Sequence, residues 1–282
     1  MKKLLASLVT VSLLVLTGCS ASGPEAPKTG LEGKEVSAYL QGAYIDAKEA
    51  QSKLQNAGFE VIATYKPVKK GMTIVFTNEA LKSEAAKPGR ANAAVLRLFV
   101  DKKEKTISFT NPVYFGKAFM QAQYNHSVYN AQLEAINKEF SGLKGSKDKL
   151  KFDDLAGYHF MMSMPYYSDV DELGLGKNED LITKAKNYKK GKLLIFELKL
   201  SDTSTLLGYD LGKRTKKFVK KIGRANATVL PYCISIENGK ATSLEAKYYL
   251  AISYPLLSMG EFMTISTVPG AIAKDLAKPF RK

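Results

Sequence analysis

Residues 89–96 read Gly-Arg-Ala-Asn-Ala-Ala-Val-Leu, and residues 223–230 read Gly-Arg-Ala-Asn-Ala-Thr-Val-Leu. The two octapeptides agree at seven of eight positions, which unrelated segments rarely do. Two copies of about 100 residues indicate a duplicated domain rather than a solenoid, which stacks several shorter units. The sequence therefore predicts two related domains in one chain.

The segments that flank the octapeptides extend the match. The paired segments are 71–76 with 191–196, Asn111-Pro112 with Tyr254-Pro255, and Phe119-Met120 with Phe262-Met263. The separation between paired residues grows from 120 upstream to 134 at the octapeptides and 143 downstream. This alignment predicts longer loops in the second copy.

The first copy shows a mixed pattern of strands and helices. Alternating or apolar runs predict strands over 36–45, 59–65, 72–76, 94–100 and 106–110, the last two as a hairpin. Asp46 is a suitable cap for a helix ending near Asn56, and Pro112 is acceptable as the first residue of another helix. A further helix is expected over 79–87, and one or two helices over 113–140 would link the copies.

The second copy is expected to follow the same plan. Its predicted strands cover 158–164, 193–200, 228–237 and 246–254, and its helices cover 179–188, a lysine-rich region up to 221, and 271–277. Strands joined by hairpins, with helices between them, indicate an α+β fold. We expect each domain to be a mainly antiparallel sheet with helices packed on one side, over residues 36–140 and 153–282, with a linker over 141–152.

The N-terminus has the features of a bacterial export signal. Lys2 and Lys3 precede an apolar run over 4–16, which is shorter than the roughly 20 residues of a membrane-spanning helix. The ending Leu-Thr-Gly-Cys19 resembles the lipobox, in which the cysteine thiol is acylated after cleavage. The alternative is an ordinary signal peptide followed by an incidental cysteine. Residues 1–18 are thus interpreted as a lipoprotein signal peptide and 19–35 as a flexible tether.

This interpretation predicts a location as well as an anchor. Two or more acyl chains hold a protein stably on a membrane, whereas one chain does so only marginally. The mature chain would be attached to a membrane in the cell envelope, on its periplasmic face. Ser20 follows the cysteine, and the absence of aspartate there favours the outer membrane in a Gram-negative organism.

Composition excludes several classes of protein. Hydrophobic residues make up 45% of the 282 residues, which is too many for a mainly disordered chain. The formal net charge is +15, mostly from lysine, yet nucleic acid is not an expected partner outside the cytoplasm. The lysines would favour anionic lipid headgroups, or they simply form a solvated surface. With Cys19 acylated, Cys233 is the remaining thiol and is expected to be buried and inert.

The order of these elements resembles that of domain-of-unknown-function family 302. The residues that carry the likeness in the first copy are Ala57–Phe59, Thr73–Asn78, Val95–Val100 and Ser108–Phe115, and those in the second copy are Leu193–Phe196 and Leu230–Glu237. The likeness covers most of 36–120 and, more loosely, 155–265. It implies small α+β domains that pair as dimers, so a tandem chain could form such a pair internally. It implies no particular activity.

The octapeptides also supply the best candidate binding residues. Arg90 and Arg224, with Asn92 and Asn226 beside them, would occupy equivalent loops entering a strand. Two guanidinium groups related by a pseudo-twofold axis could bind one anionic small molecule. The alternative is structural: Gly89 and Gly223 make turns, and the Arg and Asn side chains tie those turns to neighbouring backbone.

Other candidates are weaker. His126 and His159 lack a neighbouring carboxylate or nucleophile in the sequence, and neither has metal-ligand spacing. The aromatic and methionine run over 158–167 could line a pocket or bind a soft metal, or simply pack as a strand. No nucleophile elbow, phosphate-binding loop or metal-ligand helix motif occurs, so no catalytic residue, metal or cofactor is expected.

Three functional hypotheses follow. The leading one is a membrane-anchored envelope lipoprotein that binds a ligand or an envelope protein in the groove between the copies. The second is an envelope enzyme whose active-site residues are dispersed in the sequence. The third is a structural lipoprotein that holds envelope layers together.

Overall fold

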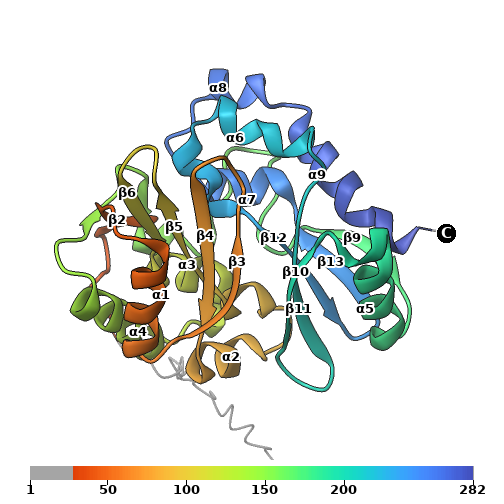
Figure 1. Ribbon diagram of the computed structural model, residues 1–282, viewed down its shortest axis with the longest axis horizontal. Coiled ribbons are helices and arrows are strands. Elements are labelled where there is room, and N and C mark those ends of the chain that lie inside the picture. The colour runs from red at the N-terminus through yellow and green to blue at the C-terminus, as the bar shows by residue number, and fades with distance from the viewer. Residues whose placement is uncertain (1–27, 282) are drawn as a thin grey trace, which may run out of the picture.

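The computed structural model describes residues 28–281 and contains two large antiparallel sheets, each with helices packed against it, and a separate pair of short strands. The predicted α+β fold is confirmed. The expected signal peptide, Cys19 and the tether up to residue 27 lie outside the described residues. Figure 1 shows the two sheets side by side, with α1 beside the first sheet and α5 beside the second.

The first sheet has the strand order β3-β4-β5-β6-β2-β7. Its elements are β2 (Tyr39–Ala43), α1 (Ala47–Asn56), β3 (Glu60–Tyr65), β4 (Gly71–Thr77), α2 (Glu79–Ala85), β5 (Leu96–Asp101), β6 (Thr106–Thr110) and α3 (Pro112–Met120). These bounds lie within a few residues of the expected ones. Helix α4 (His126–Glu139) then packs against α1, α2 and α3.

The second sheet has the strand order β10-β11-β12-β13-β9. Its elements are β9 (Val170–Leu175), α5 (Asn178–Asn187), β10 (Leu194–Lys199), β11 (Ser204–Tyr209), α6 (Phe218–Lys221), β12 (Tyr232–Glu237), β13 (Lys240–Leu244) and α7 (Ala246–Ser253). Helices α8 (Met259–Thr264) and α9 (Val268–Ala277) complete the chain.

The two copies share one topology. The order of elements is the same in both copies: β2-α1-β3-β4-α2-β5-β6-α3 in the first and β9-α5-β10-β11-α6-β12-β13-α7 in the second. The spatial order of the strands also agrees, since β3-β4-β5-β6-β2 in the first sheet corresponds to β10-β11-β12-β13-β9 in the second. The first residues of α1 and α5, Ala47 and Asn178, are 131 residues apart, and those of α3 and α7, Pro112 and Ala246, are 134 apart. The separation is nearly constant.

This constancy corrects the flanking alignment. Residues 71–76 form β4, whose counterpart is β11 and not residues 191–196. Asn111 caps α3, and its counterpart is Glu245, which caps α7: each side chain accepts a hydrogen bond from the main-chain N–H two residues later. The second copy therefore has almost the same length as the first, and the prediction of longer loops was wrong.

Three expected elements of the second copy are also wrong. Residues 158–164 form bends and turns, and the first strand of this copy is β9. The lysine-rich region expected to be helical contains strand β11 before the short helix α6. Residues 246–253 form helix α7, not the second strand of the hairpin.

The expected linker and the end of the tether are part of the fold. Within the linker, β7 (Lys144–Gly145) pairs with β2, and β8 (Lys149–Lys151) pairs with β1 (Glu35–Ser37). The N–H of Phe152 also donates to the carbonyl of Lys34. Residues 34 and 35, expected in the tether, are therefore part of the fold, and the connection between the copies is fixed to the first sheet through β7.

The two copies share a buried interface. Edge strands β3 and β10, which are counterparts, lie next to each other (Figure 1). The hydroxyl of Tyr114 on α3 donates to the carbonyl of Ile252 on α7 at 2.7 Å, and the rings of Tyr39 and Tyr254 stack with centroids 5.9 Å apart. Because equivalent elements meet, the copies are related by a pseudo-twofold axis.

Candidate functional site

The two octapeptides form equivalent turns at the interface between the copies. Gly89 and Gly223 have positive φ angles of 70° and 99°, which favour glycine, and each precedes a 3-10 helix: η1 (Ala91–Ala94) and η6 (Arg224–Val229). Helix η1 contacts β11 and β12 of the second copy, and η6 contacts β5 and β6 of the first. Each turn therefore packs against the sheet of the other copy.

Each turn meets an acidic residue at the end of the other copy's strand. Arg224 forms a bidentate ion pair with Asp101 at the end of β5, with Nε–Oδ2 at 2.7 Å and Nη2–Oδ1 at 2.8 Å. At the equivalent place, both oxygens of Glu237 at the end of β12 accept the Gly89 N–H, at 3.2 and 3.1 Å. The contacts are related by the pseudo-twofold axis, but their chemistry differs.

This difference leaves Arg90 without an ionic partner among residues 28–281. Its Nη1 atom makes one long hydrogen bond of 3.4 Å to the carbonyl of Phe119, and its buried Nε has no partner. The guanidinium carbon lies 5.3 Å from the ring centroid of Tyr167, within cation–π range. Arg90 is therefore held by aromatic and main-chain contacts and forms no ion pair, while the carboxylate of Glu237 lines the same cavity.

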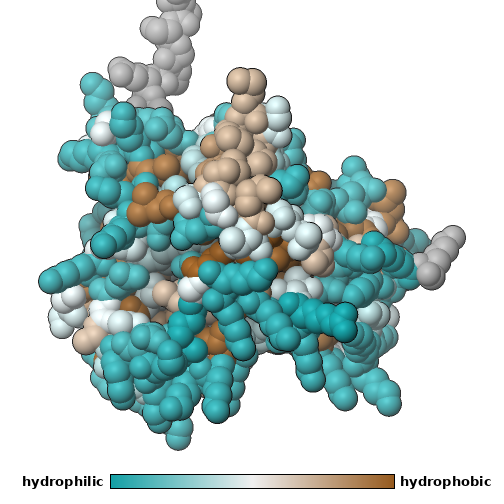
Figure 2. All heavy atoms as spheres, turned by 90° about the horizontal axis from the view of Figure 1, so that it is seen from above, coloured by the Kyte–Doolittle hydropathy of each residue, from teal (hydrophilic) through white to brown (hydrophobic). Residues whose placement is uncertain are grey.

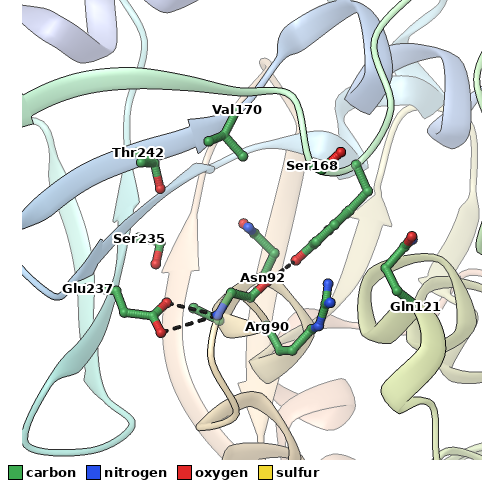
Figure 3. A pocket seen from close by; sticks show the side chains of 11 residues that line it. Arg90, Asn92, Gln121, Ser168, Val170, Ser235, Glu237 and Thr242 are labelled. Atoms are coloured by element: carbon green, nitrogen blue, oxygen red, sulfur yellow. Dashed lines mark hydrogen bonds between the residues drawn. The ribbon is translucent and has the colours of Figure 1, made fainter.

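Arg90 lines a cavity of about 340 Å³ between the copies. The other polar groups in its walls are the side chains of Asn92, Gln121, Ser168, Ser235, Glu237 and Thr242. Figure 3 shows Arg90 pointing toward Gln121, on the opposite side of the Gly89 backbone from Glu237. The walls come from η1, from the residues after α3, and from the second sheet, so the cavity exists only because the copies are paired.

Tyr167 connects the two sides of this cavity. Its hydroxyl donates to the carbonyl of Gly89 at 2.8 Å, and its ring packs against Phe119 and Tyr248. Burial raises the pKa of Tyr167 to about 12, so the phenol is neutral at physiological pH. Tyr167 therefore positions the first turn as a hydrogen-bond donor and supports Arg90.

The structure separates the candidate residues predicted from the sequence. Arg90 and Asn92 line the inter-copy cavity, whereas Arg224 and Asn226 do not. The guanidinium of Arg224 is already paired with Asp101, and the Asn226 amide donates to the carbonyl of Ile222 within its own turn. The two arginines therefore do not converge on one anion, and the second turn has the structural role that was the alternative.

Arg97 is a notable residue that the sequence reasoning treated only as part of a strand. It is 4% exposed, and its Nη2 atom donates to the carbonyl of Pro231 at 3.2 Å and to Sγ of Cys233 at 3.1 Å, across the copies. Cys233 is buried, as expected, and burial raises the pKa of its thiol despite the nearby guanidinium. The partners of Arg97 lie 134 and 136 residues away in the sequence, so no local pattern around Arg97 could predict this contact.

The two histidines lie outside the cavity, and the run over 158–167 reaches it through Tyr167. Nδ1 of His126 lies 3.1 Å from the Tyr124 hydroxyl, and Nδ1 of His159 lies 2.8 Å from the carbonyl of Met161. In the run over 158–167, Tyr167 lines the cavity of Arg90, whereas Met161 and Met162 are exposed rather than packed in a strand. Among residues 28–281, no group of three or more His, Cys, Asp or Glu side chains is arranged to hold a metal ion.

Comparisons with known proteins gave no match to a family model, to a curated protein or to a solved structure. Within residues 28–281, every helix is too short or too polar to cross a membrane.

Proposed function

We propose that this protein is a lipoprotein of the bacterial cell envelope, attached to a membrane through Cys19, that binds a small acidic molecule in the cavity between its two copies. The observation that supports this proposal is Arg90, a guanidinium that has no ion-pair partner among residues 28–281 and lies in the wall of a cavity of about 340 Å³. Binding pockets for small molecules usually start at about 300 Å³, so the volume is suitable for a compact ligand.

The chemistry of the walls limits the ligand. The Arg90 guanidinium offers parallel N–H donors, which suit the planar oxygens of a carboxylate. Glu237, Ser235 and Thr242 on the opposite wall offer hydrogen-bond acceptors and hydroxyl groups. These groups favour an acid that also carries hydroxyl or ammonium groups over a purely apolar or a multiply charged ligand.

The membrane attachment in this proposal is supported by the sequence alone. The short apolar run, the small residues before Cys19 and the polar segment after it agree with a lipoprotein signal and its tether. The resemblance to domain-of-unknown-function family 302 supports paired α+β domains and adds nothing on the ligand.

Binding of small carboxylates tests the cavity. Acetate, lactate, gluconate and L-glutamate would be titrated into the full chain while ligand-detected NMR and thermal shift are recorded. We expect at least one of these acids to bind, and Arg90→Ala to weaken that binding by roughly tenfold, equivalent to about 1.4 kcal/mol.

Arg214→Ala is the matched control, because it removes an exposed guanidinium that does not line the cavity. This variant should bind as the wild type does. The proposal is wrong if none of the four acids binds the wild-type protein, or if every acid that binds does so equally tightly to the wild type and to the Arg90→Ala variant.

A further inference from the structure

A second cavity of about 290 Å³ lies where the first copy's β3–β4 turn faces the residues around α6. We call it the basic cleft, and it is formed by Pro67, Val68, Lys69, Lys213, Lys216, Lys217, Val219, Lys220 and Arg224. None of these residues lines the cavity of Arg90. Figure 2, which views the molecule from the end where α6 lies in Figure 1, shows many hydrophilic side chains on this face.

The basic cleft carries a large uncompensated charge. Six of its nine residues are cationic, and none is acidic. Two of the six have ionic partners behind the cleft: Lys216 pairs with Asp210 at 2.7 Å, and Arg224 pairs with Asp101. Lys69, Lys213, Lys217 and Lys220 have no carboxylate partner among residues 28–281. Four like charges around one cavity repel each other, and a multivalent anion would relieve that repulsion.

The two walls of the cleft are fixed relative to each other. Nη2 of Arg224 donates to the carbonyl of Lys69 at 2.8 Å, which ties the second octapeptide to the β3–β4 turn. The Tyr65 hydroxyl donates to Asp210, and Nζ of Lys216 lies 5.6 Å from the Tyr65 ring centroid. Pro67 and Val219 are buried beneath the lysines. The lysine side chains therefore extend from a rigid frame.

We propose that the basic cleft binds a phosphate-bearing polyanion. Ammonium groups act as point charges without the planar preference of guanidinium groups, so several lysines suit tetrahedral phosphate oxygens. The cavity of Arg90 differs, because its charges are one arginine and one glutamate among neutral polar groups. The phosphate could belong to a soluble diphosphate or to the headgroup of an anionic lipid, and the cleft recognises the chemistry that these share.

Equilibrium dialysis of the full chain against two radiolabelled probes tests this proposal. The probes are inorganic pyrophosphate and sn-glycerol 3-phosphate, which is the headgroup of phosphatidic acid without its acyl chains and carries a charge of about −1.5 to −2 near neutral pH. We expect at least one probe to bind, with an affinity that falls as sodium chloride is raised. Glycerophosphocholine, in which the phosphate charge is neutralised, should compete poorly.

Charge-reversal variants locate the binding. Lys217→Glu combined with Lys220→Glu should weaken probe binding by roughly tenfold or more, whereas Lys217→Arg combined with Lys220→Arg should retain it. The matched control is Lys48→Glu with Lys184→Glu, which makes the same change in net charge on α1 and α5, outside the cleft. The control should weaken binding by less than about twofold.

The outcomes are distinct. Binding of pyrophosphate alone assigns the cleft to soluble phosphates, and binding of sn-glycerol 3-phosphate alone assigns it to lipid headgroups. The proposal is overturned if neither probe binds, or if the two glutamate pairs weaken binding equally, which would indicate only the overall charge. Either failure leaves the carboxylate proposal untouched, since the two cavities share no residue.

Discussion

At the scale of single residues, one side-chain difference separates the two turns. Asp101 reaches the guanidinium of Arg224, whereas Glu237, with one more methylene, takes the Gly89 N–H instead. Octapeptides that differ at one position therefore give an ion-paired arginine in one copy and, among residues 28–281, an arginine without an ion pair in the other. The repeated motif predicted that the two turns occupy equivalent positions in the fold. It could not predict which side chain each turn binds, because that side chain comes from the opposite copy, more than 120 residues away.

The Asp101–Arg224 pair should make stability sensitive to acid. Burial opposes ionisation of Asp101, but hydrogen bonds from Arg224 and from the N–H groups of Lys103 and Glu104 outweigh it and hold its pKa below the ordinary value. The contribution of this ion pair to the free energy of unfolding is therefore fully present above the pKa of Asp101 in the unfolded chain, about 3.9. It is lost as the pH falls through the lower pKa of Asp101 in the folded protein. Urea unfolding from pH 7 down to pH 3 measures it.

Asp101→Asn should destabilise the fold by about 2–3 kcal/mol near pH 7, because it leaves a mostly buried guanidinium unpaired. The loss should shrink toward pH 3. Asp202→Asn is the control, since Asp202 forms an exposed ion pair with Lys199, and such pairs contribute little. Equal effects of the two substitutions would show that the Asp101 contact has no structural role.

At the scale of elements, the sequence predicted the first copy well and the second copy poorly. The segments before and after the first octapeptide have a clear periodicity of apolar residues, and their helices begin at recognisable N-cap residues, Asp46 and Asn111. In the second copy, every residue of α7 except Lys247 is buried, so its apolar run has no helical period and reads equally well as a strand.

Strand β11 was missed for a different reason. Its glycine, Gly208, reads as a loop or a break in a strand. In the structure the ring of Phe196 occupies the place where a side chain at position 208 would begin, so glycine is required there for packing. Periodicity cannot reveal such a contact between neighbouring strands.

Two helical glycines give opposite predictions. A Cβ at Gly116 in α3 would overlap the ring of Tyr129 on α4, whereas a Cβ at Gly270 in α9 would meet no atom within 4 Å. Gly116→Ala should destabilise by about 1–3 kcal/mol despite the higher helix propensity of alanine. Gly270→Ala should stabilise by about 0.5–1 kcal/mol. Thermal unfolding of both variants is the measurement, and stabilisation by Gly116→Ala would contradict the α3–α4 packing.

At the scale of the whole molecule, the duplication predicted an internal pair, but the sequence could not show which residues would face the shared cavity. Arg90 and Asn92 were found because the octapeptide repeats, whereas Gln121, Tyr167 and Glu237 belong to three separate segments. The aromatic run that contains Tyr167 indicated a possible pocket, but Gln121 and Glu237 have ordinary local contexts, and only the pairing of the copies brings the three together.

Attachment to a membrane is the prediction that concerns the whole chain. Cys19→Ala should leave the chain without acyl groups and with its signal uncleaved, or release it as a soluble species. Metabolic labelling with a fatty acid and fractionation of membranes measure this. Cys233→Ala is the control, because this thiol is buried in the interface and should carry no label. Unchanged labelling and fractionation of Cys19→Ala would contradict the anchor.

The pairing of β1 with β8 has a mechanical consequence. Residues 35–37 are hydrogen-bonded to residues 149–151, which lie in the connection between the copies. A pull applied at residue 34 therefore reaches that connection before it reaches either sheet. Tension on the chain at residue 34 would load the segment that connects the two copies, so the hydrogen bonds between β1 and β8 would be the first to resist it.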